Sequence, residues 1–470
     1  MGVDVVDVDL EKAGVEELRD LVRGLLERVQ LLEAQVKELE TENERLRREN
    51  ERLGGDGGKK DPPSWAKANQ PQSEKKGRKK RSKGFARRRD KVTHRVKHAY
   101  AECPECGTPL SGGRERSRRQ VITLPRIRVQ VTEHIMVERK CPQCEKAFTP
   151  KAELEAVAAG QQRVGISVQS EVAMLREGCR MPFEVIQRYL EQRCGLHLSV
   201  GELVALIQGF AKHGKKEYEA LGEQIRGSPV VHGDETGWRE NGRNGYLWSF
   251  STPQVRYFLY RKSRGKTVVS EALGDEFHGV LVSDFYASYN VHKGDHQRCW
   301  IHLLRDIHDL KKTYPDDETV ATWADGVRKV YDRAKAYAGP ELDLPAVQQK
   351  AERRKQQLKY EQELWELCEP HVRKGLPMST LCERVEQYLP EMFMFVADPR
   401  VPADNNAAER SLRGQVVSRK ISGGTRSAKG SETKSISASL FGTWLLKGRD
   451  LYQACHEVLT TPIPTPEPTI

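Results

Sequence analysis

The first fifty residues carry the most regular hydrophobic pattern in the chain. Leucines recur every seven residues, at positions 18, 25, 32, 39, 46 and 53. Val22, Val29, Val36, Asn43 and Asn50 occupy the alternate seam position. β-Branched or Asn residues at one seam position with Leu at the other are typical of parallel two-stranded coiled coils, whereas a helix packed on its own chain drifts off strict sevens. We therefore predict a leucine-zipper homodimer over residues 1–58, ending in a glycine-rich stretch.

Residues 151–228 have a helical pattern. A helix over residues 183–192, a break at Gly195 and a second helix from Ser199 to about Ala211 resemble a helix-turn-helix. Ser199 and Glu202 have the spacing of a capping box at the start of the second helix. The face of that helix that would read DNA lacks basic residues, so helix packing and DNA contact both remain open.

Short apolar runs replace the helical pattern after Pro229. Strand-like runs cover 230–234, 245–250, 255–260, 279–283 and 296–300, with helical patterns at 266–273 and 303–310. Three strands, a helix, a strand and a further strand follow the order of the ribonuclease-H-like fold. A charged helical stretch, 311–395, separates this first part of the core (229–310) from a second part (396–460). We predict a multidomain α/β protein with a ribonuclease-H-like core, an all-α insertion and a disordered tail at 461–470.

Charge is concentrated in one stretch of the 470 residues. Residues 75–97 contain thirteen Lys and Arg and one acid, Asp90, and this stretch accounts for the net charge of +11. It lies in a linker, 59–97, rich in Pro, Gly, Ser, Lys and Arg that cannot bury enough surface to fold alone. We predict a disordered arm that contacts the phosphates of DNA or RNA, the alternative being a solvated tail. The candidate contacts are Lys79, Lys80, Arg81, Arg87, Arg88 and Arg89.

Two Cys-x-x-Cys pairs flank residues with alternating apolar positions. Cys103 and Cys106 form the first pair, and Cys141 and Cys144 the second. Four thiolates around one tetrahedral centre make a closed structural zinc site. The alternation at 121–131 favours β-hairpin strands, so we predict a zinc-ribbon-like module at 98–150. A disulfide or an iron–sulfur centre is the alternative chemistry, and the module either recognises DNA or is purely structural.

Three acidic residues stand where the predicted elements can bring them together. Asp234 and Asp284 each end an apolar strand-like run, and Glu409 lies in a helical stretch far downstream. Three nearby carboxylates repel one another unless a cation lies between them, and oxygen ligands without Cys or His suit Mg²⁺ or Mn²⁺. Glu235 should point away from Asp234 on an extended chain and serve as a surface or supporting carboxylate. Cys299 and His302 are better explained by a structural role than by half a metal site.

The remaining features concern location. The first residues are acidic and lack the apolar segment of a secretory signal, and no apolar run approaches the ~18 residues of a membrane span. Six scattered cysteines outside the two pairs fit a reducing compartment. We expect a cytoplasmic, nucleoid-associated protein with no membrane partner.

Taken in order, these motifs resemble the DDE transposases of bacterial insertion sequences, of the IS66 type. The resemblance rests on four stretches that occur in the family's order: residues 232–238 (HGDETGW), 283–289 (SDFYASY), 299–302 (CWIH) and 405–413 (NNAAERSLR). It covers nearly the whole chain, with one departure at Phe285, where many relatives carry Gly.

The resemblance implies a function and roles for single residues. Asp234, Asp284 and Glu409 would be the catalytic triad and hold two Mg²⁺ ions for DNA end cleavage and strand transfer. Arg413 would face the triad from one helical turn beyond Glu409 and contact DNA, although a salt bridge is as good an explanation. Small accessory proteins of the same element are further implied partners. The competing hypotheses are a non-catalytic zinc-containing DNA-binding regulator and a ribonuclease-H-type nuclease such as a junction resolvase.

Overall fold

The computed structural model describes residues 90–125, 127–150, 157–158 and 163–461, with single positions between 14 and 41. The chain divides into two compact units, residues 1–122 and 123–470. Most of the predicted zipper, the basic linker up to residue 89 and the tail from 462 lie outside the described residues. Val29, Leu32 and Val36, from the predicted zipper seam, are helical and are 48%, 50% and 53% exposed in the single chain. No helix in the described ranges is long and apolar enough to cross a membrane.

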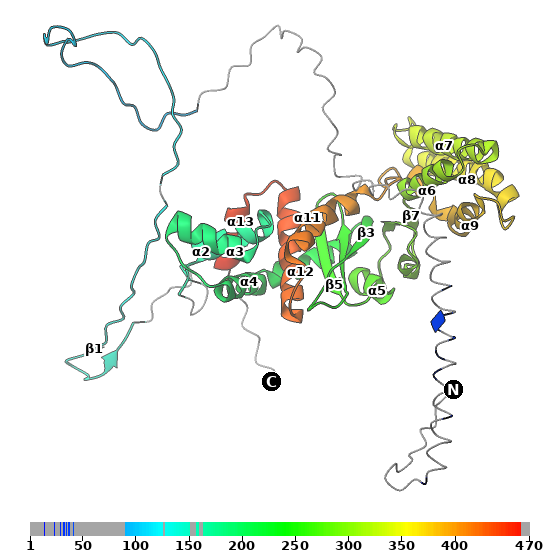
Figure 1. The fold of residues 1–470 in the computed structure, drawn as a ribbon, viewed down its shortest axis with the longest axis horizontal. Helices are drawn as coiled ribbons and strands as arrows, with labels where there is room; N and C mark the ends of the chain where they lie inside the picture. The colour runs from blue at the N-terminus through cyan, green and yellow to red at the C-terminus, as the bar shows by residue number, and fades with distance from the viewer. Residues whose placement is uncertain are drawn as a thin grey trace. The chain divides into compact units, whose positions relative to one another are not determined.

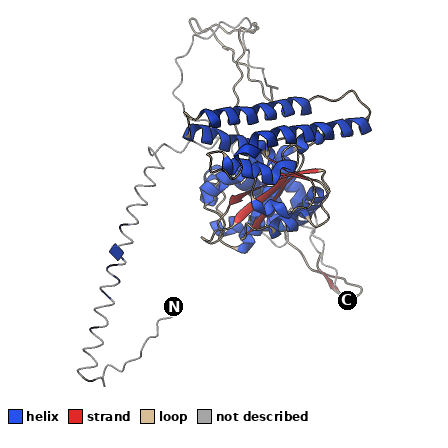
Figure 2. Ribbon diagram, turned by 90° about the vertical axis from the view of Figure 1, so that its right-hand side faces the viewer, coloured by secondary structure: helices blue, strands red, loops and turns tan. Residues whose placement is uncertain are grey.

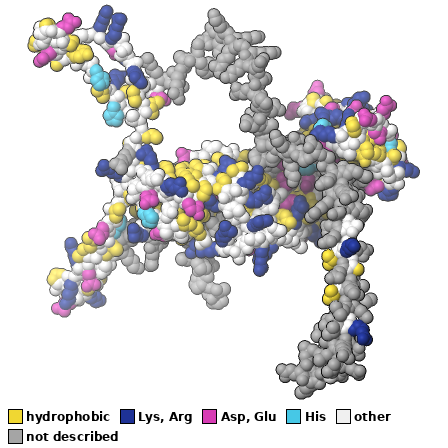
Figure 3. Space-filling model, in the orientation of Figure 1, with side chains coloured by type: hydrophobic (Ala, Val, Ile, Leu, Met, Phe, Trp, Pro, Cys, Tyr) yellow, Lys and Arg dark blue, Asp and Glu magenta, His cyan; other side chains and the backbone are white. Residues whose placement is uncertain are grey.

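The strands predicted over residues 121–131 are not formed. The described residues of this stretch have irregular backbone, and Val121, Leu124 and Val131 are largely exposed. Figure 3 shows hydrophobic side chains at the surface of the extended segments on the left of the view. Alternating apolar residues do not hold a strand unless a neighbouring strand or helix covers them, so this prediction was wrong. The hairpin that does form lies further on, between β1 (Arg139–Lys140) and β2 (Ala147–Phe148).

A five-stranded mixed sheet forms the centre of the second unit, with helices on both sides (Figures 1 and 2). Its strands are β3 (Val230–Gly237), β4 (Tyr246–Ser251), β5 (Arg256–Arg261), β6 (Val280–Ser283) and β7 (His296–Arg298). They lie in the order β5-β4-β3-β6-β7. Strand β4 is antiparallel to both of its neighbours, β3 and β5, while β6 and β7 run parallel to β3. The α/β class predicted from the sequence is confirmed.

Opposite faces of the sheet contribute to two separate hydrophobic cores. Side chains alternate along a strand, so Val231 and Leu281 enter one core while Val230, Val280 and Val282 enter the other. The helices of the first core are α2 (Ile166–Ala173), α3 (Phe183–Tyr189), α4 (Val200–Arg226), α5 (Thr267–Leu273), α12 (Ala428–Leu446) and α13 (Leu451–Thr460). Two π-helical turns, η1 (Met174–Gly178) and η2 (Leu190–Cys194), extend α2 and α3.

The helical insertion belongs to the second core. Its helices are α7 (Glu318–Ala338), α8 (Ala346–Cys368), α9 (Ser379–Tyr388) and α10 (Met394–Ala397), with short turns η4 (Glu369–His371) and η5 (Leu389–Glu391). They pack with α6 (Trp300–Thr313) on the apolar side chains of β6. Trp300 contacts both Tyr331 of α7 and Phe393 before α10, with ring centroids 5.0 and 5.2 Å apart. The insertion is therefore continuous with the core of the sheet.

Helix α12 closes the outer edge of β5 with hydroxyl groups. Three of its side chains accept hydrogen bonds from three backbone N–H groups of the edge strand: Ser435 from Tyr260, Ser439 from Phe258 and Thr443 from Arg256. Four residues of helix rise about 6 Å, and two residues of strand rise about 6.6 Å, so the two repeats stay nearly in step. At the opposite edge, the side-chain amide of Gln297 in β7 donates to Met392 and accepts from the backbone N–H of Phe395.

Helix α4 begins as predicted and ends later. Ser199 is its N-cap and forms the complete capping box with Glu202. The helix continues to Arg226, well past the expected end near Ala211. A Cβ atom at Gly214 would lie 2.5 Å from Leu440 of α12, so this glycine permits a close helix–helix contact without interrupting the helix.

Candidate active site and zinc module

Asp234 lies in β3, in the middle of the sheet. Alternation along the strand puts His232 and Asp234 toward one face and Gly233 and Glu235 toward the other. A carboxylate oxygen of Asp234 accepts a hydrogen bond from the Glu235 backbone N–H at 2.8 Å. His232 is buried, and its Nδ1 lies 3.0 Å from the side-chain oxygen of Asn405. Burial lowers the pKa of His232 to about 4, so this imidazole is neutral at physiological pH.

Asp284 follows β6 directly, beside Asp234. His232 and Val282 are partners in the parallel ladder, so Asp234 and Asp284 are each two residues further along adjacent strands. The Oδ1 atom of Asp284 accepts from the backbone N–H of Tyr286 at 2.9 Å. The strand register therefore brings two of the three predicted carboxylates to the same side of the sheet.

Glu409 reaches this region from the first turn of α11 (Asn406–Ser422), a helix that packs on β3 and β4. Its side chain is 22% exposed, and Oε1 lies 4.0 Å from Nε2 of His302 in α6. The Nδ1 atom of His302 is buried with no hydrogen-bond partner in the described structure. His302, which we expected to be structural, therefore faces a candidate ligand.

The negative charges of Asp284 and Glu409 act on the protonation of Asp234. Burial raises the pKa of Asp234 well above its ordinary value, and the negative charges of Glu235, Asp284 and Glu409 raise it further. Among the described residues, no group of three or more His, Cys, Asp or Glu side chains is compact enough to hold a metal as it stands. The donor set consists of carboxylate oxygens, which is the chemistry that Mg²⁺ and Mn²⁺ require, and a positive charge would relieve the repulsion at Asp234. The residues therefore fit such a cation by the chemistry of their donor atoms.

Glu235 has a larger structural role than a surface carboxylate. Its side chain is only 2% exposed and is bonded by the Tyr289 hydroxyl and by Arg264. Burial raises the pKa of Glu235, although these hydrogen bonds oppose the rise. Arg264 also lies 3.8 Å from the centre of the Tyr286 ring, two residues after Asp284. Neither Arg264 nor Tyr289 was identified from the sequence; the only signal was the position of Tyr289 at the end of the Asp284 motif.

Cys299 and Asn405 connect the segments that carry the acids. The buried Cys299 thiol accepts from the backbone N–H of Asn405 at 3.2 Å, and burial raises the pKa of Cys299 to about 11. Its neutral thiol and its position agree with the structural role expected for this residue. Asn405, which was not singled out, is 1% exposed and bonds to β3 through its side chain.

The predicted DNA contacts fall into two groups. Lys79 to Arg89 lie outside the described residues. Arg413 is half-buried, and its Nε has no hydrogen-bond partner in the described structure, so the salt bridge considered as its alternative explanation is not formed there.

The basic segment after α11 is anchored to the β3–β4 connection. Arg419 donates to the Thr236 hydroxyl and the Gly237 carbonyl, and Thr425 exchanges backbone hydrogen bonds with Arg239 and Asn241. The Cβ-free Gly424, at φ +117°, lies against the Arg239 backbone. These contacts hold the segment in one place on the sheet.

Both Cys-x-x-Cys pairs form the same tight turn. The backbone N–H of Cys103 donates to Thr108, and that of Gly107 donates back to Cys103. Cys141 repeats the pattern with Lys146 and Glu145. The fifth residue of each turn has a positive φ, +72° at Gly107 and +57° at Glu145.

The turns favour the thiolate form of two cysteines. A hydrogen bond with the Thr108 side chain lowers the pKa of Cys106. Backbone hydrogen bonds from Cys144 and Gln143 lower the pKa of Cys141. Since thiolates are the form that binds metal, each turn is a suitable half-site for zinc. No disulfide links the cysteines of either turn in the described structure.

Comparison with known proteins adds two family matches. Residues 161–433 match the model described as Transposase IS66 family, and residues 101–145 match the model described as the zinc-finger binding domain of transposase IS66. The first match covers more than half of the chain and contains Asp234, Asp284 and Glu409, while the second spans all four cysteines of the two turns. A search of curated proteins found no match.

Proposed function

The chain belongs to the IS66 transposase family, and on this basis we propose that it cleaves and joins DNA in a metal-dependent reaction at Asp234, Asp284 and Glu409. The observation that carries the proposal is geometric. Asp234 and Asp284 each lie two residues beyond paired positions on adjacent strands, and Glu409 lies in the first turn of a helix packed on β3, although Asp284 and Glu409 are 50 and 175 residues from Asp234 in sequence. A carboxylate with a raised pKa beside further carboxylates is typical of sites that act on phosphate esters with divalent metals.

The sheet supports a ribonuclease-H-like core. Its order, with three antiparallel strands followed by two parallel ones, agrees with the strand and helix order from which that fold was inferred. The first acid then lies on the first strand, the second directly after the fourth, and the third on a helix packed against the first strand.

In the proposed chemistry, metal ions act on the reacting oxygens, and side chains hold the metals and the DNA. Two Mg²⁺ ions would activate the attacking oxygen and stabilise the leaving oxygen of an in-line displacement. Asp234, Asp284 and Glu409 would hold them, with the buried Asp234 as the shared ligand. Arg413, one helical turn beyond Glu409 and half-buried, would contact a DNA phosphate.

DNA binding outside the active site is assigned to the N-terminal part. Cys103, Cys106, Cys141 and Cys144 would hold one structural Zn²⁺, because the family match spans both turns and the residues of each turn favour thiolates. The basic arm with Lys79, Lys80, Arg81, Arg87, Arg88 and Arg89 would bind phosphates, and the leucine repeat would pair two copies.

The test is cleavage and joining of a DNA fragment that carries the ends of the element, with Mg²⁺ and the full chain. Asp234→Asn, Asp284→Asn and Glu409→Gln should each reduce both steps by at least a thousandfold and leave DNA binding intact. Asp325→Asn, an equivalent change on an exposed carboxylate of the insertion, is the matched control and should keep full activity. Cleavage by Asp234→Asn at the normal rate would disprove the assignment. Wild-type protein that binds the ends and never cleaves would indicate a regulator.

A further inference from the structure

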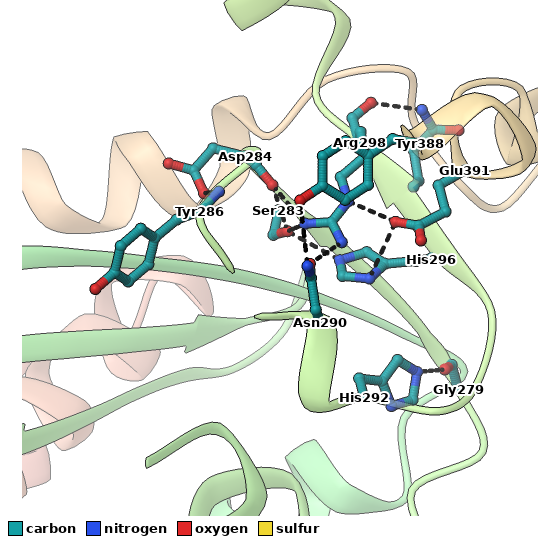
Figure 4. Close-up of polar contacts among 11 residues, drawn as sticks. Gly279, Ser283, Asp284, Tyr286, Asn290, His292, His296, Arg298, Tyr388 and Glu391 are labelled. Carbon is teal, nitrogen blue, oxygen red and sulfur yellow. Dashed lines mark hydrogen bonds and ion pairs between the residues drawn. The ribbon is translucent and has the colours of Figure 1, made fainter. Parts of the chain in front are cut away.

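Arg298 lies behind Asp284 and is completely buried. It is the last residue of β7, it is 0% exposed, and its ladder partner is Ser283. One guanidinium nitrogen, Nη1, donates to the backbone carbonyl of Asp284 at 2.9 Å and to the Ser283 hydroxyl at 3.3 Å. Nη2 donates to the side-chain oxygen of Asn290 at 2.7 Å. Figure 4 shows this guanidinium in the middle of the cluster, with the Asp284 carboxylate directed away from it.

The other side of the guanidinium contacts the helical insertion. Its Nε is paired with the carboxylate of Glu391 in η5, and its plane lies 4.4 Å from the ring centre of Tyr388 at the end of α9. His296 also approaches Glu391, at 3.5 Å. Burial lowers the pKa of His296 well below its ordinary value, so Arg298 supplies the positive charge opposite Glu391.

Burial restricts the arrangement of groups around the Arg298 guanidinium. A guanidinium removed from water is stable only when its charge is paired and its donors are satisfied, and loss of one partner leaves an uncompensated charge. The planar fork accepts few arrangements of its partners, in contrast to the more adaptable ammonium group of Lys. The position of Glu391 therefore constrains Arg298, and Arg298 constrains the Asp284 carbonyl.

A second contact ties the same loop to the insertion. Phe285, the residue after Asp284, packs against Tyr388 with ring centroids 5.6 Å apart, and Arg384 of α9 lies 5.1 Å from the Phe285 ring. The main-chain carbonyl of Asp284 is thus held by Arg298, which contacts the insertion, and the side chain of Phe285 is held by residues of the insertion itself.

We propose that Arg298 is a positioning residue for Asp284, and that the insertion, through Glu391 and Tyr388, determines where this carboxylate stands relative to Asp234. The inference rests on the proposed function, because it takes Asp284 to be a metal ligand. Residues that orient metal ligands commonly affect metal affinity by 10- to 100-fold, and the geometry assigns Arg298 to this class.

The test measures Mn²⁺ binding to the full-length chain, from the electron paramagnetic resonance signal of free Mn²⁺ and from the rise in melting temperature on adding the ion. Glu391→Gln keeps the shape of the side chain and removes the charge opposite Arg298. Glu386→Gln is the matched control, since it makes the same change in α9 at an exposed ion pair with Arg373. Asp284→Asn reports whether the carboxylate binds the ion at all.

The expected result is that Asp284→Asn loses binding, Glu391→Gln weakens it by about tenfold, and Glu386→Gln leaves it unchanged. Arg298→Lys, which retains the charge without the fork, should also weaken binding and serves if Glu391→Gln does not fold. Folded Glu391→Gln or Arg298→Lys with wild-type affinity would overturn the positioning role and leave the proposed function standing. Wild-type protein whose Mn²⁺ binding does not depend on Asp284 would instead remove the proposed function itself.

Discussion

The side-chain amide nitrogen of Asn405 lies 2.7 Å from the carbonyl oxygen of Gly233 and donates a hydrogen bond to it. Through this bond, and through the contact of its side-chain oxygen with His232, the residue at the start of α11 is fixed to the strand residues just before Asp234. Helix α11 carries Glu409 one turn later. A single buried amide therefore sets the register between two of the proposed ligands.

Replacement of Asn405 by Ala should destabilise the second unit. The Gly233 carbonyl and the His232 ring would lose their partners in the interior, at a cost of about 2 kcal/mol or more in unfolding free energy. Thermal melting of the full chain should show a decrease of several degrees, and cleavage should decrease as well. The neighbouring Asn406→Ala, at the first position of the helix, is the control and should change the melting temperature little. Equal melting of the two variants would contradict the role given to Asn405.

Asp234→Asn should stabilise the metal-free protein while abolishing cleavage. The ordinary pKa of an Asp carboxyl is 3.8, and the pKa of Asp234 in the folded chain is higher. Between the unfolded pKa and the folded pKa, the folded state therefore binds more protons than the unfolded state. This group therefore lowers the unfolding free energy as pH rises from 3.8 through its folded pKa. Asn cannot ionise, and the variant should lose that part of the decline. Melting curves across a pH series in a chelator measure it; a pH dependence identical to that of wild type would refute the prediction.

The hydroxyl groups of α12 offer a paired comparison. Ser439→Ala removes the acceptor of the buried Phe258 N–H and should reduce the unfolding free energy by about 1–3 kcal/mol. Ser437 is equally buried, but its hydroxyl donates to Thr433 within the same helix. Ser437→Ala should therefore cost less than about 0.5 kcal/mol, because the helical backbone bonds remain. Denaturant unfolding of both variants distinguishes edge coverage from a general effect of removing a buried serine.

The buried pair between Lys434 of α12 and Glu177 of η1 should be sensitive to loss of one partner and tolerant of loss of both. The two charged groups are 2.7 Å apart, with side chains 7% and 6% exposed. Glu177→Gln leaves the ammonium unpaired and should cost about 3–5 kcal/mol. The double variant Glu177→Leu with Lys434→Met should recover part of that loss. A double variant as unstable as the sum of the two single changes would show that charge pairing is not what these residues provide.

Zinc should affect DNA binding and leave the sheet unaffected. Cys106→Ser should lower the bound zinc from about one equivalent to near zero and weaken binding to element ends, with the main thermal transition unchanged. Cys179→Ser, which changes an exposed cysteine outside both turns, is the control. Metal content by mass spectrometry and a DNA-binding titration measure the two effects. Undiminished DNA binding by zinc-free protein would limit the metal to a purely structural role.

Local sequence patterns predicted the strands of the sheet because each strand has an apolar run within its own residues. The apolar run before Asp284 became β6 within one residue of the expected bounds, and the run before Asp234 became β3, which extends three residues past its expected end. The Ser199–Glu202 pair marked the start of α4. The end of α4 lies beyond the expected Ala211, and Gly214 within the extension packs against Leu440, more than two hundred residues away. The strands expected at 121–131 are not formed, because an alternating pattern does not by itself provide the neighbouring strand or helix that must cover its apolar side.

The supporting residues of the site could not be predicted in the same way. Arg298, Asn405 and Tyr289 carry no recognisable spacing relative to their partners, because their roles depend on how β7, α11 and η3 (Ala287–Val291) meet. Their chemistry is a matter of tertiary contacts: a buried guanidinium between two segments, an amide between a helix and a strand, and a phenol on a buried carboxylate.

At the outer edge of β5, hydroxyl groups of α12 accept hydrogen bonds from backbone N–H groups of the strand. An edge strand whose N–H groups are already hydrogen-bonded does not pair with a strand of another copy. A second copy of the chain is therefore not expected to extend the sheet at β5. For the same reason, we expect a high concentration of the chain not to cause edge-to-edge aggregation at β5.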